Sequence, residues 1–231
     1  MLLQSFLLII TTLSIYFTTA FIQQKYHLIW LNPILVSIFL VSPILIIYQI
    51  DYTEYFAATQ WLNSLIELAV VALGYPLYKQ VNQIKQQWKI IFLILSLGAV
   101  VAITTSLLLT LAIISLPEIA ISLSLKSITT PIGIALTEQL GGNSAITAIA
   151  IIIAGLLGAT LGHSWLKVIK IQSPLAQGLA IGAASHVIGS AAMTKISNIH
   201  TAYSSIALIT SALLTSLISP WSIPTLLKIL Y

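Results

Sequence analysis

Residues Gly178 to Lys195 read GLAIGAASHVIGSAAMTK, and this stretch decides how the rest of the chain is interpreted. It is flanked by long apolar runs, yet it carries several polar or ionisable side chains and three glycines. An apolar helix is seldom built in this way unless its backbone breaks or it lines a polar cavity. We therefore predict two half-helices on either side of Ser185 and His186, at a place where a solute is bound.

The composition indicates an integral membrane protein. Of the 231 residues, 58% are hydrophobic and only 6% are charged, whereas about a quarter of an ordinary soluble domain is charged. The apolar runs are continuous and long, as in membrane-spanning helices, and do not alternate as in a membrane β-barrel. The nine basic residues are all lysines and lie mostly between the runs, which favours loop anchoring over nucleic-acid binding.

Several classes of function are excluded by what the sequence lacks. There is no cysteine, so disulfides, thiolate metal sites and cysteine nucleophiles are ruled out. The four histidines are scattered without metal-ligand spacing, and neither a phosphate-binding loop nor a nucleophile elbow is present. We therefore expect no cofactor, no metal site and no enzymatic activity.

The apolar pattern predicts a single all-α membrane domain over residues 1–231, with its first segment retained and not cleaved as a signal peptide. A faint similarity between the two halves is compatible with inverted repeats. We expect eight hydrophobic segments, at about 2–22, 28–50, 61–78, 88–116, 117–140, 144–171, 173–197 and 202–230.

The lysines predict the topology, because cytoplasmic loops gather lysine. Lys25 and the cluster 79–89 fall in alternate loops, which places the N-terminus outside. With the N-terminus outside, Lys167 and Lys170 lie on the cytoplasmic side only if segment 117–140 enters the membrane and returns to the same side. The length of this segment agrees, because neither of its halves has the roughly 20 residues of a full span. We favour six full spans plus two re-entrant hairpins from opposite faces; eight full spans is the alternative.

A second stretch, Lys126-Ser-Ile-Thr-Thr-Pro131, has the same design as the first. Thr130-Pro131 suits a helix start, with threonine as the N-cap and proline at the first helical position, and Ser185 would cap the other half-helix. Two such N-termini would hold a carboxylate without arginine. The predicted substrate-binding residues are Lys126, Ser127, Thr129, Thr130, Pro131, Ser185, His186, Gly189, Ser190 and, from a weaker third break, Asn32.

Each of these residues also has a purely structural interpretation. Serine and threonine in membrane helices often bond to their own backbone, Pro131 can be a simple kink, and Lys126 can reach for the surface. His186 is either a hydrogen-bonded structural residue or a proton-coupling group, because imidazole titrates near neutral pH. Glu67, inside an apolar run, is the other proton-coupling candidate, and pairing with a nearby lysine or hydroxyl is its alternative. His200 is expected at the membrane interface.

Several motifs carry a family resemblance: Lys126-Ser-Ile-Thr-Thr-Pro-Ile, Leu140-Gly-Gly, Ala154-Gly-Leu-Leu-Gly-Ala, Ala176-Gln-Gly-Leu-Ala-Ile-Gly and Ala184-Ser-His-Val-Ile-Gly-Ser-Ala. In this order they resemble the LrgB/CidB family over about residues 28–220. The resemblance implies an antiholin-like protein of the bacterial plasma membrane, which works beside a small four-span partner of the LrgA/CidA type.

The resemblance also implies two functions. A plastid relative resembles a glycolate/glycerate translocator, and bacterial members are implicated in uptake of pyruvate or related short monocarboxylates. This favours a carrier of small carboxylates. The alternative is a regulator of murein hydrolase export and lysis that transports nothing itself. Homo-oligomer formation is left open.

The chain departs from the family pattern near its site. Ser190 and Ala192 stand where the family usually has threonine and a basic residue, and Asn198 and His200 stand where it tends to have acidic residues. Because the expected cation is absent, a bound anion would depend on helix ends, hydroxyls, His186 and Lys126.

Overall fold

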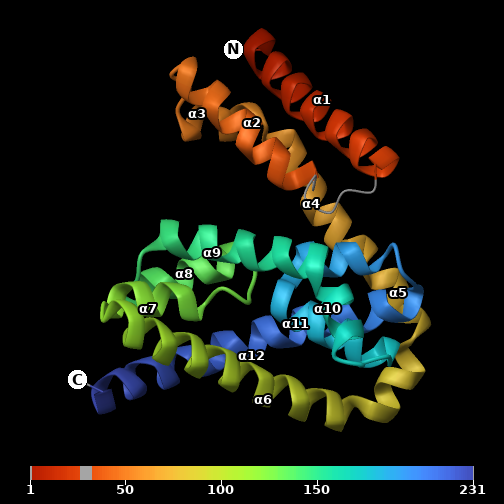
Figure 1. The fold of residues 1–231 in the computed structure, drawn as a ribbon, viewed down its shortest axis with the longest axis vertical. Helices are drawn as coiled ribbons and strands as arrows, with labels where there is room; N and C mark the ends of the chain where they lie inside the picture. The colour runs from red at the N-terminus through yellow and green to blue at the C-terminus, as the bar shows by residue number, and fades with distance from the viewer. Residues whose placement is uncertain (1, 27–32, 231) are drawn as a thin grey trace. The chain divides into compact units, whose positions relative to one another are not determined.

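The computed structural model describes residues 2–26 and 33–230, and the elements there are helices (Figure 1). This confirms the predicted all-α class. Within the described residues, five helices are long and apolar enough to cross a membrane, or six if one sharply bent pair counts as a span. The chain forms two compact units, Met1–Ala72 (unit 1) and Leu73–Tyr231 (unit 2).

Unit 1 holds α1 (Leu2–Tyr26), α2 (Pro33–Ile47), α3 (Tyr52–Ala58) and α4 (Gln60–Ala72). Helix α1 packs against α2 and α3, and a hydrogen bond of 2.9 Å joins Thr12 Oγ1 to Tyr55 Oη. The predicted segment 28–50 is followed by a bend of 117° between α2 and α3. Asn32 lies outside the described residues, as does the side chain of Glu67.

The predicted segment 61–78 is two helices, α4 in unit 1 and α5 (Gly74–Lys79) in unit 2. Helix α4 has 13 residues, which at 1.5 Å per residue extend about 20 Å. That length is shorter than the roughly 30 Å of a membrane's hydrocarbon core.

Three long helical paths form the frame of unit 2. They are α6 (Val81–Ile114), α12 (Asn198–Leu230), and α9 (Ser144–Leu157) with its continuation through a π-helical turn, η1 (Gly158–Gly162), into α10 (His163–Val168). Helices α6 and α12 run side by side in Figure 1, with buried apolar residues of both in two clusters.

The predicted segment 117–140 is a helical hairpin of α7 (Pro117–Ser124) and α8 (Thr130–Leu140). Its two ends meet: the Asn143 backbone N–H donates to Ser122 Oγ over 2.7 Å, and Asn143 Nδ2 donates to Glu118 Oε1 over 3.4 Å. The eight residues of α7 extend about 12 Å, too little to cross a bilayer. This geometry agrees with re-entry and not with a full span.

The predicted segment 173–197 is α11 (Pro174–Met193), which breaks at His186, where φ is 41° and ψ is −136°. A Cβ on Gly189 would lie 3.1 Å from the Ile181 carbonyl oxygen. Eight residues of straight helix would separate these positions by about 12 Å, so the second half folds back on the first. The break predicted at Ser185-His186 is confirmed.

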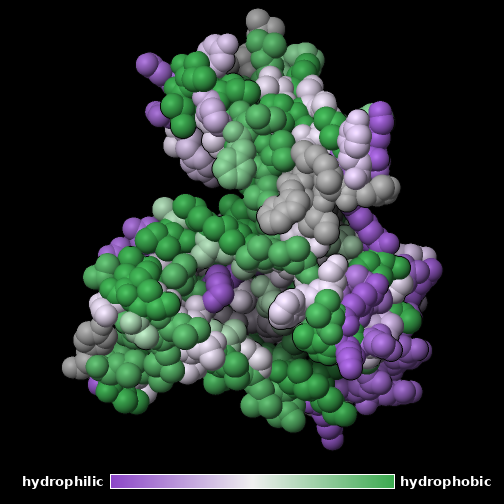
Figure 2. Space-filling view, viewed as in Figure 1, coloured by the Kyte–Doolittle hydropathy of each residue, from purple (hydrophilic) through white to green (hydrophobic). Residues whose placement is uncertain are grey.

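The lysines gather at one end of unit 2. Leu77 and Ile84, from α5 and the start of α6, pack in one cluster with Leu179 and Tyr203, from α11 and the start of α12. Figure 2 shows hydrophilic residues over this region. It carries Lys79, Lys85 and Lys89 together with Lys167 and Lys170, so the positive-inside rule predicts that it is the cytoplasmic end. Lys228, in the last turn of α12, and Lys126, at the tip of the α7–α8 hairpin, depart from the pattern.

Cysteine labelling tests this topology, and the absence of native cysteine makes single-cysteine variants clean reporters. We expect Lys170→Cys and Lys195→Cys to react only from the cytoplasmic side, and Glu118→Cys and Glu138→Cys only from the other side. All four side chains are exposed. Labelling of either pair from opposite sides would show that its segment spans the membrane.

Candidate functional site

The two broken segments meet on one turn of α9. The buried His186 Nε2 lies 2.8 Å from the Ile151 carbonyl oxygen, and because a carbonyl only accepts, the imidazole donates. The Ile151 side chain lies against Gly133 of α8, where an added Cβ would be 2.5 Å from Ile151 Cδ1. Helix α9 therefore holds the break of α11 and the first turn of α8 together.

Glycines make this approach possible. A Cβ on Gly155 would lie 2.8 Å from the His186 ring, and a Cβ on Gly158, at the start of the π-helical turn, would overlap the Ser185 hydroxyl. Glycine is required where helices come this close. Gly189, predicted to contact solute, lies against Ser185 and Ile181 and allows the chain to fold back.

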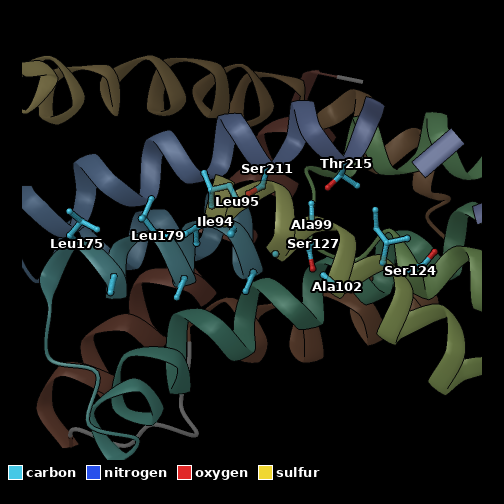
Figure 3. A pocket seen from close by; sticks show the side chains of 16 residues that line it. Ile94, Leu95, Ala99, Ala102, Ser124, Ser127, Leu175, Leu179, Ser211 and Thr215 are labelled. Atoms are coloured by element: carbon cyan, nitrogen blue, oxygen red, sulfur yellow. The ribbon is translucent and has the colours of Figure 1, made fainter. Parts of the chain in front are cut away.

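A cavity of about 390 Å³ lies between the two breaks (Figure 3). Its walls come from α6, the tip of the α7–α8 hairpin, the first half of α11 and α12. Most lining residues are apolar or small, including Ala184, which immediately precedes the break. The polar lining residues are Ser124, Ser127, Ser211 and Thr215. Small-molecule sites commonly combine an apolar wall with a few polar groups in this way.

The hydroxyls of this cavity differ in how they are bonded. Ser124 Oγ donates to the Ile121 carbonyl over 2.7 Å and is already used. Ser211 Oγ is buried without a hydrogen-bond partner within the described part of the chain. A buried hydroxyl with unused capacity is costly unless water or a ligand satisfies it. Ser211 is therefore the clearest polar contact that the cavity offers to a solute.

Lys126 lies at the hairpin tip, between Ser124 and Ser127 in the sequence, and is partly buried. Its Nζ donates to Ser106 Oγ of α6 over 2.6 Å and to the Leu123 carbonyl over 3.5 Å. Both acceptors are neutral, so these bonds leave the positive charge of the ammonium uncompensated. The lysine thus turns towards α6 beside the cavity.

The other predicted residues have different surroundings. Helix α8 begins at Thr130, with Thr129 as an N-cap that makes no side-chain capping bond, one residue earlier than predicted. Pro131 is exposed, and none of these three residues lines the cavity. Ser190 Oγ donates to the Ser204 carbonyl over 3.2 Å and ties the second half of α11 to α12.

Sequence reasoning missed the contribution of α12 to the cavity. Ser211 and Thr215 are four residues apart and so share one face of that helix. That spacing was the available signal, but serine and threonine are frequent along this helix, and only its packing shows which pair faces the cavity.

Comparison with known proteins gives a consistent result. A model of the LrgB-like family matches residues 12–225. Holin-like protein CidB of Staphylococcus aureus is 33% identical over 217 residues, which cover 94% of this chain and 95% of that protein. The uncharacterized protein YxaC of Bacillus subtilis is 32% identical over 214 residues, 93% of either chain. No solved structure matches this chain.

Proposed function

This chain belongs to the LrgB-like family, and from that premise we propose that it is a multi-pass carrier of small monocarboxylates in the bacterial plasma membrane. Pyruvate, glycolate and glycerate are the solutes of the right class. The observation that carries the proposal is the cavity of about 390 Å³ flanked by two broken helical hairpins. Carriers commonly place discontinuous helices at the solute site.

The solute would be held by few but specific groups. The Ser127, Ser211 and Thr215 hydroxyls would donate hydrogen bonds to the carboxylate, and the small residues of α6 and α11 would contact its short carbon chain. The Lys126 ammonium would supply the nearby positive charge that Ala192 does not. Thr129, Thr130 and Pro131 would act by starting α8, whose N-terminus carries a partial positive charge.

The two hairpins give the solute a route from either side. One begins and ends near Glu118 and Asn143, and the other near Gln177 and His200. Small movements of one hairpin at a time would open the cavity to alternate faces. His186, whose Nε2–H is held by Ile151, would couple a proton, with Glu67 as the other candidate.

A second function is favoured by the name of the relatives. The name holin-like protein CidB fits a holin-like membrane protein more directly than a carrier. In that function the chain would modulate a small LrgA/CidA-type partner and, through it, murein hydrolase export and lysis, as the family resemblance implies. In that function the cavity would serve packing or regulation and no solute would cross.

Filling the cavity tests the carrier. Ala184 lines it with an exposed side chain, so Ala184→Leu adds bulk where there is space. We expect saturable uptake of radiolabelled pyruvate or glycolate into vesicles, with the partner co-expressed, to fall by about tenfold or more, equivalent to about 1.4 kcal/mol of lost binding. Ala112→Leu, on an exposed face of α6 away from the cavity, is the matched control and should transport normally.

The same experiment separates the two functions. If wild-type vesicles take up no short carboxylate in a saturable way while the lysis phenotype is intact, the carrier is wrong and the regulator stands. Equal uptake by Ala184→Leu and Ala112→Leu, at equal protein levels, would show that solute does not pass through this cavity.

A further inference from the structure

A second pocket, of about 430 Å³, lies where α10 meets the first turns of α11 and α12. We call it the His163 pocket. It is separate from the central cavity, and no residue lines both. Its lining consists of His163, Lys167, Gln172, Gln177 and His200. All five side chains are polar, and none is acidic.

Two of these side chains form a fixed floor. Gln177 Nε2 donates to the Ile171 carbonyl over 2.6 Å, so its Oε1 accepts from His200 Nε2 at 2.8 Å. His200 Nδ1 then accepts from the Ser197 hydroxyl at 2.8 Å. His200 is buried by these contacts, and its expected position at the membrane interface stays a prediction. Both ring nitrogens of His200 and both polar atoms of the Gln177 amide are therefore already in use.

The remaining side chains leave donors for a ligand. His163 Nδ1 is buried and has no hydrogen-bond partner within the described residues. The His163 ring stands edge-on to the His200 ring, with centroids 5.7 Å apart, so the floor fixes its position. It directly follows the π-helical turn, a feature that often marks functional sites. Lys167, one turn further along α10, adds an exposed ammonium at the rim.

The side chains that line the His163 pocket indicate which class of ligand it can bind. A metal ion would need several free ligands, but the His200 nitrogens are engaged, and the described residues hold no group of three histidine or acidic side chains. A lipid chain would need apolar side chains around it, but all five lining side chains are polar. Imidazole N–H, ammonium and amide donors with no competing carboxylate suit an oxyanion.

We propose that the His163 pocket binds a small oxyanion, such as the carboxylate of an organic acid, at a site separate from the central cavity. Lys167 and His163 bind the oxyanion, and Gln172 closes the rim. The position of the pocket at the lysine-rich end of unit 2 places it where a cytoplasmic anion arrives first. Binding there does not require that the chain transport anything.

The test uses trifluoroacetate as a ¹⁹F NMR probe, titrated onto the full chain in zwitterionic nanodiscs. All proteins carry Ala184→Leu, which fills the central cavity, so that binding of the probe in that cavity does not contribute to the signal. We expect saturable broadening of the probe signal, and an affinity about fivefold to tenfold weaker in Lys167→Gln and in His163→Gln.

Lys170→Gln is the matched control, because it removes the same charge from an exposed lysine three residues away that does not line the pocket. It should bind the probe as the Ala184→Leu parent does. Equal loss in Lys167→Gln and Lys170→Gln would overturn the site in favour of diffuse surface charge. Unchanged binding in both Lys167→Gln and His163→Gln, or displacement of the probe by added phosphatidylglycerol, would also overturn it. Monodisperse elution of each variant confirms that it is folded.

Discussion

Replacing Gly182 by alanine should lower the free energy of unfolding by about 2–3 kcal/mol or more, the upper end of what overpacking costs. Gly182 packs directly on the backbone of Ser204 in α12, where an added Cβ would lie 2.7 Å from Ser204 Cα and overlap its carbonyl oxygen. A backbone atom cannot rotate away as a side chain can. Helices α11 and α12 would separate, and both the cavity wall and the His163 pocket depend on their contact.

The matched control is Gly98→Ala on α6, where an added Cβ meets nothing within 4 Å. In the middle of a helix that change should be neutral or stabilise the protein by roughly 0.5–1 kcal/mol, because alanine loses less backbone entropy than glycine. Thermal unfolding of purified protein in detergent compares the two. If both variants melt at the wild-type temperature, the close packing of α11 on α12 is wrong.

Replacing His186 by alanine should both destabilise the protein and strongly reduce uptake. The Ile151 carbonyl would lose its donor, which costs about 1–3 kcal/mol for a buried group. His186 already bears the strain of φ 41° and ψ −136°, and alanine would keep that strain without the hydrogen bond that offsets it. We expect pyruvate uptake to fall roughly 100-fold, equivalent to about 2.7 kcal/mol.

Glycine at the same position separates backbone strain from imidazole chemistry. His186→Gly should recover about 1 kcal/mol of stability relative to His186→Ala, because glycine adopts positive φ readily. It restores no donor to Ile151, so uptake should stay as low as in the alanine variant. Full uptake by His186→Gly would mean that transport needs neither the imidazole nor its hydrogen bond to Ile151.

Local sequence patterns predicted where the helices are interrupted. Proline and glycine change the backbone's allowed conformations wherever they occur, and polar residues in an apolar run need partners. These local effects marked the break at Ser185-His186 and the start of α8 within one residue. The division of segment 61–78 at Leu73 was not predicted, although Gly74 and Pro76 stand at that point.

The sequence by itself thus determined an all-α membrane protein with two interrupted hairpins, because hydrophobicity and backbone preference are properties of each segment. Only the tertiary structure decided which side chains meet. Lys126 donates a hydrogen bond to Ser106, which lies 20 positions earlier in the sequence. Ser211 and Thr215 line the cavity, and the rings of His163 and His200 are in contact. Such contacts depend on how each helix is rotated and where it crosses its neighbour, and those are set by the packing of many small residues together.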